Sequence, residues 1–201
     1  MTRKFFVLTG FILAALPAAA LLGACASNAP APLLYQLRVE PPVAAVVPVS
    51  STQVLQLLLP VQLPEVLDRD ARVVAQGQAG VQALPGHRWA EPLRDAVPRL
   101  LRQDLALLLG EARVWAAPLP VGVVITRQLR VELLLLQTVA DRSAVALQAR
   151  WTLSDPLGRT APRVQTTQLN VPTTGATPEA WVAAHRLALW RLAEQVAQSS
   201  R

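Results

Sequence analysis

An apolar segment near the start of the chain ends at Cys25, the only cysteine. This feature decides which residues belong to the folded domain, because a cleaved signal is not part of it. Arg3 and Lys4 precede the segment, and Leu22-Gly23-Ala24 leads directly to the cysteine. A positively charged start, an apolar stretch and a small-residue cleavage site together form a secretory signal, which is absent from the mature fold. We therefore expect residues 1–24 to be a lipoprotein signal peptide that is cleaved between Ala24 and Cys25.

The thiol of Cys25 would then carry a diacylglycerol, and its freed amine would carry an acyl chain such as palmitate. Each buried methylene contributes about 0.8 kcal/mol, and two or more chains anchor a protein stably at a membrane. An uncleaved transmembrane anchor is the alternative, because the apolar stretch approaches the ~20 residues of a membrane span. Pro17 and the three alanines after it favour the processed signal. We expect no cofactor other than this covalent lipid.

The residues after the signal suffice for one domain on a short tether. Residues 25–33, with two prolines and a serine, are expected to form the lipidated start and the tether, and residues 34–201 a single α+β periplasmic domain. The formal net charge is +6, but the arginines are dispersed, so we expect no nucleic-acid partner. Two histidines and no second cysteine leave little for a metal site, and we expect none.

Most of the chain beyond the tether shows the alternation of apolar and polar residues that indicates strands. Residues 129–135 and 145–153 alternate most regularly, and the turn at residues 141–143 predicts an antiparallel hairpin with one buried face. A second hairpin is expected around residues 77–80. Shorter or weaker strands are expected at residues 35–39, 53–59, 113–116 and 164–171.

Two segments have helical spacing. The first begins near Trp89 to Pro92 and ends at Gly110, and the second begins with Thr177 as N-cap and Pro178 in its first position. Strands and helices do not alternate as βαβ units, so the sequence predicts an α+β fold: an antiparallel β-sheet with two α-helices packed on one face.

Asp104 and His185 occupy positions where the two helices would present apolar residues to the core. A buried polar group needs a partner, and an unpaired buried charge is expensive. If both helices pack on the same face of the sheet, these two side chains could satisfy each other. We therefore expect a structural pair of Asp104 with His185, and a solvent-exposed Asp104 is the alternative if Pro98 rotates the helix.

Trp190 and Leu187 lie opposite the expected core stripe of the last helix. Tryptophan is enriched at the energetic centres of protein interfaces, so these two residues are a candidate contact surface.

No catalytic motif is apparent: the chain has no G-x-S-x-G, P-loop or H-E-x-x-H pattern. A hydrolase that uses His87 or His185 stays open as a minor alternative. The sequence favours a protein that is not an enzyme.

Four local patterns in the mature chain resemble the PqiC-type family, the ABC-transport auxiliary lipoproteins of Gram-negative bacteria. These patterns are Tyr35-x-Leu37, Leu63-Pro64-x-x-Leu67-Asp68-Arg69, Arg88-Trp89-Ala90-Glu91-Pro92-Leu93 and Trp151-x-Leu153-x-Asp155-x-x-Gly158. They occur in the family's order and span nearly all of the mature chain.

The resemblance implies a lipoprotein of the outer membrane that faces the periplasm. Its expected partners are an MCE-domain protein and the associated permease, which form a lipid transport system between two membranes, and a homo-oligomer is a further expectation. Ala26 follows the lipidated cysteine, where an aspartate would have suggested retention in the inner membrane. The alternative function is a lipoprotein assembly factor for an outer-membrane β-barrel.

Overall fold

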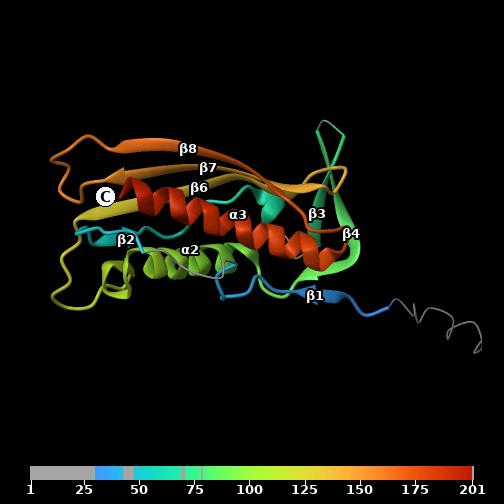
Figure 1. Ribbon diagram of the computed structural model, residues 1–201, viewed down its shortest axis with the longest axis horizontal. Helices are drawn as coiled ribbons and strands as arrows, with labels where there is room; N and C mark the ends of the chain where they lie inside the picture. The colour runs from blue at the N-terminus through green and yellow to red at the C-terminus, as the bar shows by residue number, and fades with distance from the viewer. Residues whose placement is uncertain (1–29, 43–47, 69–70, 78, 201) are drawn as a thin grey trace, which may run out of the picture. The chain divides into compact units, whose positions relative to one another are not determined.

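The computed structural model describes residues 30–42, 48–68, 71–77 and 79–200, and residues from Pro32 onward form one compact unit (Figure 1). The predicted signal peptide, its cleavage position at Ala24 and the lipidated Cys25 lie outside the described residues. The unit contains two α-helices, α2 (Leu93–Leu109) and α3 (Pro178–Ser199), and two short 3-10 helices, η1 (Glu65–Leu67) and η2 (Glu111–Arg113), within the described part of the chain.

The strands of the described residues belong to one mixed eight-stranded sheet. They are β1 (Leu33–Tyr35), β2 (Leu55–Leu57), β3 (Ala71–Gln76), β4 (Gly80–Trp89), β5 (Val114–Ala116), β6 (Arg127–Thr138), β7 (Ala144–Ser154) and β8 (Arg163–Pro172). The path along the sheet is β1-β4-β3-β6-β2-β5, and β7 and β8 extend it from β6. The fold is therefore α+β, as predicted.

The long strands pair as their alternation predicts. β6, β7 and β8 form an antiparallel ladder, with Val131 opposite Trp151 and Leu147 opposite Leu169, and β3 and β4 form the second predicted hairpin.

Alternate residues of β7 are buried from Val145 onward, and those of β6 are buried as far as Leu133. A register shift between Leu133 and Leu135 then moves the buried position to Leu136, so the prediction that Leu135 faces the core is wrong.

The prediction of a purely antiparallel sheet is wrong. β1 runs parallel to β4, and β2 runs parallel to both β5 and β6. These strands are joined to their partners through long connections rather than tight turns, which is the requirement for parallel pairing. The first strand also lies earlier than expected, because its pairing runs from Leu33 to Tyr35, after which the chain leaves β4.

The helices begin and end where the sequence predicts. The hydroxyl of Thr177 accepts a hydrogen bond from the backbone N–H of Ala180 at 3.3 Å, with Pro178 in the first turn. At the end of α2, Gly110 adopts φ 105° and ψ 137°, and its N–H donates to the carbonyl of Ala106. This backbone region is essentially restricted to glycine.

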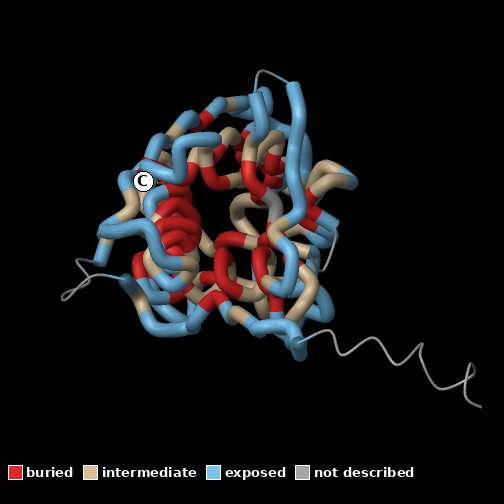
Figure 2. Tube along the Cα trace, turned by 90° about the vertical axis from the view of Figure 1, so that its right-hand side faces the viewer, coloured by how far each residue is buried: buried red, intermediate tan, exposed pale blue. Residues whose placement is uncertain are grey.

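α3 packs against β7 and β8, and α2 packs beside α3 and against β5 (Figure 1). The curled sheet and the two helices enclose a common core, and Figure 2 shows buried segments of helix and strand turned toward one another inside the exposed outer positions. Because α3 contacts both the sheet and α2, residues on more than one side of this helix are buried.

Candidate functional site

The stripe of α2 that faces the core carries Asp104, which is fully buried. Arg186 on α3 donates two hydrogen bonds to its carboxylate, with N–O distances of 2.6 and 2.8 Å. The same guanidinium donates to the backbone carbonyls of Arg38 at 2.8 Å and Val39 at 3.3 Å. Burial raises the pKa of Asp104, while the contact with Arg186 opposes that shift. One arginine therefore joins both helices to the segment that follows β1.

Asp104 and His185 do not form the predicted pair. His185 is buried, but its Nδ1 lies 2.7 Å from the carbonyl oxygen of Trp181, and its ring meets the edge of Trp89 with centroids 5.5 Å apart. Because a carbonyl only accepts, Nδ1 carries the proton in this contact. Burial lowers the pKa of His185 to about 4, so the ring is neutral at pH 7. Asp104 takes the neighbouring residue, Arg186, as its partner instead.

Arg72 on β3 is a second buried cation, and aromatic rings surround it. The central carbon of its guanidinium lies 4.9 Å from the ring centroid of Tyr35, 5.0 Å from that of Trp89 and 5.7 Å from that of Trp181. One of its nitrogens donates to the carbonyl of Pro178 at 3.4 Å. Burial lowers the pKa of Arg72 to about 10, which leaves it charged at pH 7. A desolvated cation–π contact contributes about 2 kcal/mol, so these rings stabilise the buried charge.

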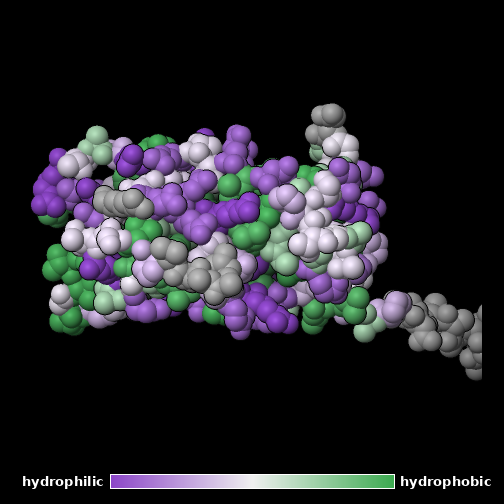
Figure 3. Space-filling model, viewed as in Figure 1, coloured by the Kyte–Doolittle hydropathy of each residue, from purple (hydrophilic) through white to green (hydrophobic). Residues whose placement is uncertain are grey.

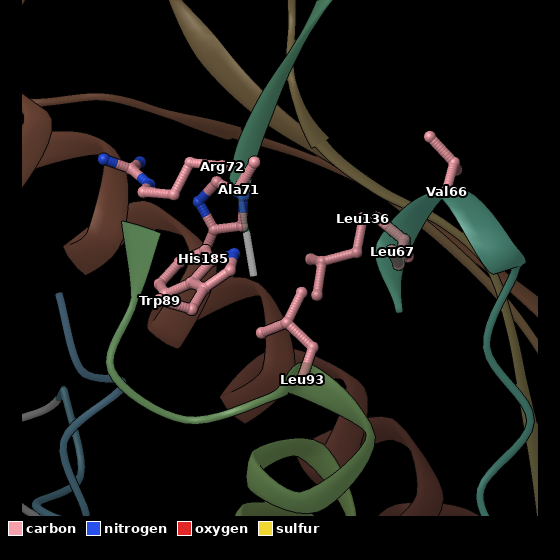
Figure 4. Close-up of a pocket in the computed structure, with 8 residues that line it drawn as sticks. All are labelled: Val66, Leu67, Ala71, Arg72, Trp89, Leu93, Leu136 and His185. Carbon is pink, nitrogen blue, oxygen red and sulfur yellow. The ribbon is translucent and has the colours of Figure 1, made fainter. Parts of the chain in front are cut away.

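A small cavity adjoins this cluster, and Figure 4 shows the side chains that line it. Trp89 and His185 lie side by side on one side of it, and Leu93, Leu136 and Leu67 lie on the other. Its volume is about 10 Å³, the space of one water molecule. The cavity therefore has no room for a substrate, a lipid or an organic cofactor.

His87 makes a different contact at the start of the unit. Its Nδ1 lies 3.0 Å from the hydroxyl of Tyr35, and the two rings stack with centroids 5.6 Å apart. This contact joins β1 to β4. Within the described residues, neither histidine bonds a carboxylate or a serine, and no group of three potential ligands could hold a metal. The two histidines therefore make contacts that hold the fold.

Trp190 is not available as the predicted contact surface, because only 1% of it is exposed. Its ring lies 6.0 Å from the guanidinium of Arg186, and Leu187 is partly buried against the core. The prediction of an exposed pair assumed that α3 buries one stripe, whereas α2 also covers the side that carries Trp190.

Sequence reasoning missed the two arginines that organise the interior. Arg72 alternates with the buried Val74, and residues two apart on a strand share a face. Arg186 stands four residues before Trp190, and residues four apart share one side of a helix. The spacing of Arg72 from Val74 was visible in the sequence. The spacing of Arg186 from Trp190 gave no signal of burial, because Trp190 was expected to lie opposite the core. An arginine is almost never fully buried unless it is paired, and neither partner was predicted.

Neither helix of the described residues combines the length and the apolar character that a membrane span requires. Comparison with curated proteins gives no match.

Two crystal structures share the fold. One, an uncharacterized protein, has a TM-score of 0.67 and 17% sequence identity, over 86% of this chain and 100% of the other. The second, a protein from Xanthomonas campestris, has a TM-score of 0.64 and 18% identity, over 84% of this chain and 95% of the other. These identities support the fold alone.

A family model described as the ABC-type transport auxiliary lipoprotein component matches residues 35–197. The match includes every described strand except β1, of which it contains only the last residue, and every described helix except the last two residues of α3. The chain therefore belongs to this family, the PqiC-type ABC-transport auxiliary lipoproteins.

Proposed function

We propose that this protein is a non-enzymatic accessory component of an MCE- and ABC-type lipid transport system, held at the outer membrane and facing the periplasm. Its role is to dock the transport machinery at that membrane. The family match over residues 35–197 is the observation that carries this proposal, because the family consists of auxiliary lipoproteins of ABC-type transport. The partners are an MCE-domain protein and its permease, and the docked form is a homo-oligomer.

The anchor in this proposal is the acylated Cys25. Cleavage after Ala24 would free the amine for the second acylation, and Ala26 lacks the acidic character that would favour retention in the inner membrane. The stretch from Cys25 to Leu33 spans at most about 30 Å when fully extended. The first strand would therefore stay near the membrane, which fits the exposure of Leu33 and Leu34.

A docking role also agrees with the contacts of the buried charged residues and His185, which are made within the chain. The buried residues Asp104, Arg186, Arg72 and His185 are all engaged with other parts of the chain. The cavity beside them holds about one water molecule. These features favour a scaffold that acts through its surface over a catalyst that binds a small substrate.

Crosslinking of the acylated protein in intact cells tests the proposal. The protein would be purified under a denaturing wash, and the attached proteins identified by mass spectrometry, with a Cys25→Ala variant as the unanchored control. Recovery of an MCE-domain protein is the expected result, together with outer-membrane fractionation that the control loses. Recovery of an outer-membrane β-barrel alone would instead support the assembly-factor function.

A further inference from the structure

The connection between β5 and β6 is apolar and projects into solvent. Residues 117–125, named here the tip loop, contain no charged or hydrogen-bonding side chain. Val121 is fully exposed, at 106% of its reference area, and Val124 is 75% exposed. Pro118 and Pro120 restrict the backbone, which limits the entropy that the loop would lose on binding.

A second exposed apolar residue lies at the same end of the unit. Leu157, which is 74% exposed, belongs to the connection between β7 and β8. Gln128, near the start of β6, pairs with Ser154 at the end of β7. The tip loop therefore leads into β6 beside the point where the β7–β8 connection leaves β7. Both connections lie at the end opposite β1 (Figure 1). Figure 3 shows hydrophobic atoms at the lower left, where the tip loop lies, and hydrophilic atoms above them at the same end.

Two arginines lie at the same end of the unit as these apolar side chains. Arg127 begins β6 and Arg163 begins β8, and both line one hollow of about 130 Å³ at this end. Within the described residues, neither arginine lies within ion-pair distance of a carboxylate, although the charge of Arg127 helps to lower the pKa of Asp155. The nearby carboxylate of Asp155 is already engaged, since Arg159 donates to it at 2.8 and 3.2 Å.

We propose that this end is a lipid-binding surface that inserts Val121, Val124 and Leu157 into an anionic phospholipid bilayer, with Arg127 and Arg163 at the lipid phosphates. Protruding aliphatic side chains beside two arginines are complementary to the two layers of such a membrane, which are the hydrocarbon interior and the negatively charged phosphates at its surface. This surface lies at the end opposite β1, which the proposed docking function keeps near the acylated Cys25, so the bilayer that it binds is not the one that holds the anchor. The inference therefore goes beyond the proposed docking function and does not depend on it.

A protein partner is the other class of occupant. Protein interfaces concentrate their binding energy in Trp, Tyr and Arg residues that fill pockets on the partner. The tip loop has no aromatic residue, and the two valines that it exposes most, Val121 and Val124, are small aliphatic side chains. The observations therefore favour a bilayer, and a protein becomes an outcome of the experiment.

A local probe tests the inference on the full acylated chain. With Cys25 acylated, a Val121→Cys variant has one free thiol, which can carry an environment-sensitive fluorophore. The matched control is Val81→Cys on β4, an exposed valine away from the tip. Each labelled protein is mixed with vesicles of neutral phosphatidylcholine or of phosphatidylcholine with phosphatidylglycerol.

We expect a blue shift of the label at position 121 with the anionic vesicles and none at position 81. In the unlabelled protein without the acyl chains, the Val121→Asp and Val124→Asp variants should each weaken vesicle binding at least about tenfold, since each removes the burial of one aliphatic side chain. Arg127→Gln and Arg163→Gln should each weaken it about fivefold, and salt should reduce the difference.

Three results would overturn the inference: no shift at position 121 with anionic vesicles, an equal shift at position 81, or a shift only when a purified transport protein is added. The last result would assign the tip loop to a protein interface. Circular dichroism of each variant tests whether unfolding explains a loss of vesicle binding. These substitutions are at exposed positions, so the spectrum should be unchanged. The crosslinking experiment is independent of the tip label, so failure of the two proposals can be told apart.

Discussion

Replacement of Arg186 with methionine tests the buried contact that joins the two helices to the segment after β1. Methionine retains much of the apolar stem but removes the guanidinium. Asp104, which is fully buried, would lose both of its donors, and the carbonyls of Arg38 and Val39 would lose theirs. Removal of one partner from a buried ion pair costs about 3–5 kcal/mol, because the other charge stays buried without compensation.

Urea unfolding at pH 7, followed by circular dichroism, measures this loss. For a slope of about 2 kcal/mol per molar urea, the midpoint should fall by roughly 1.5–2.5 M. The control is Asp68→Asn, which removes the ion pair with Arg94. That pair has an N–O distance of 2.8 Å, but both side chains are exposed. An exposed pair contributes about 1 kcal/mol or less, so the control midpoint should move by less than about 0.5 M.

The double variant Asp104→Leu/Arg186→Met separates the ion pair from the packing around it. Replacement of both charges by apolar side chains removes the uncompensated carboxylate, so the double variant should be more stable than Arg186→Met alone. The reasoning is refuted if Arg186→Met unfolds within about 1 kcal/mol of the unaltered protein. It is also refuted if the double variant gains nothing over Arg186→Met.

Three further predictions concern α3, its histidine and the end of α2. The folded pKa of His185 is about 4 against about 6.5 unfolded, so the stability that it contributes is present above pH 6.5 and lost as the pH falls toward 4. The loss should approach about 3 kcal/mol, measured by urea unfolding at both pH values, and His185→Asn should remove that part of the pH dependence. Trp190→Glu should unfold the protein, as near-ultraviolet circular dichroism would show, and a folded variant would contradict the burial of this ring. Gly110→Ala should lower the free energy of unfolding by about 1–3 kcal/mol, because φ 105° disfavours a side chain, whereas an unchanged melting temperature would argue against that strain.

Local signals predicted the parts of the fold that depend on neighbouring residues. Thr177 with Pro178 marks the start of α3, and Gly110 marks the end of α2, because caps depend on the conformation of a few residues. The β6–β7 hairpin follows from its period of two and its short turn. The parallel pairing of the three-residue strands β1, β2 and β5 was not predictable, since so short a pattern of apolar and polar residues is compatible with parallel and antiparallel pairing alike.

The sequence predicted that Asp104 is buried but did not predict which residue it bonds. The position of Asp104 in an apolar stripe predicted that it is buried, because the helical period fixes which side chains share a face. Its partner depends on how α3 is rotated against α2, which no local pattern specifies. A rotation of one residue, about 100°, separates His185 from Arg186, and this difference decides which side chain meets the carboxylate.

The contacts at the start of the unit have a mechanical consequence for a protein attached through its N-terminus. The segment that leaves β1 is held by Arg186 through the carbonyls of Arg38 and Val39, and β1 itself is held by the contact of Tyr35 with His87. Arg186 is in turn fixed by Asp104 on α2. Force on the start of the chain would act first on β1, which pairs with β4, and then on the segment that Arg186 holds, so it would reach both helices without first unpairing the β6–β8 ladder. With the proposed acylation at Cys25 as the point of attachment, the buried charges would have a role beyond stability, because they connect the segment after β1 to both helices.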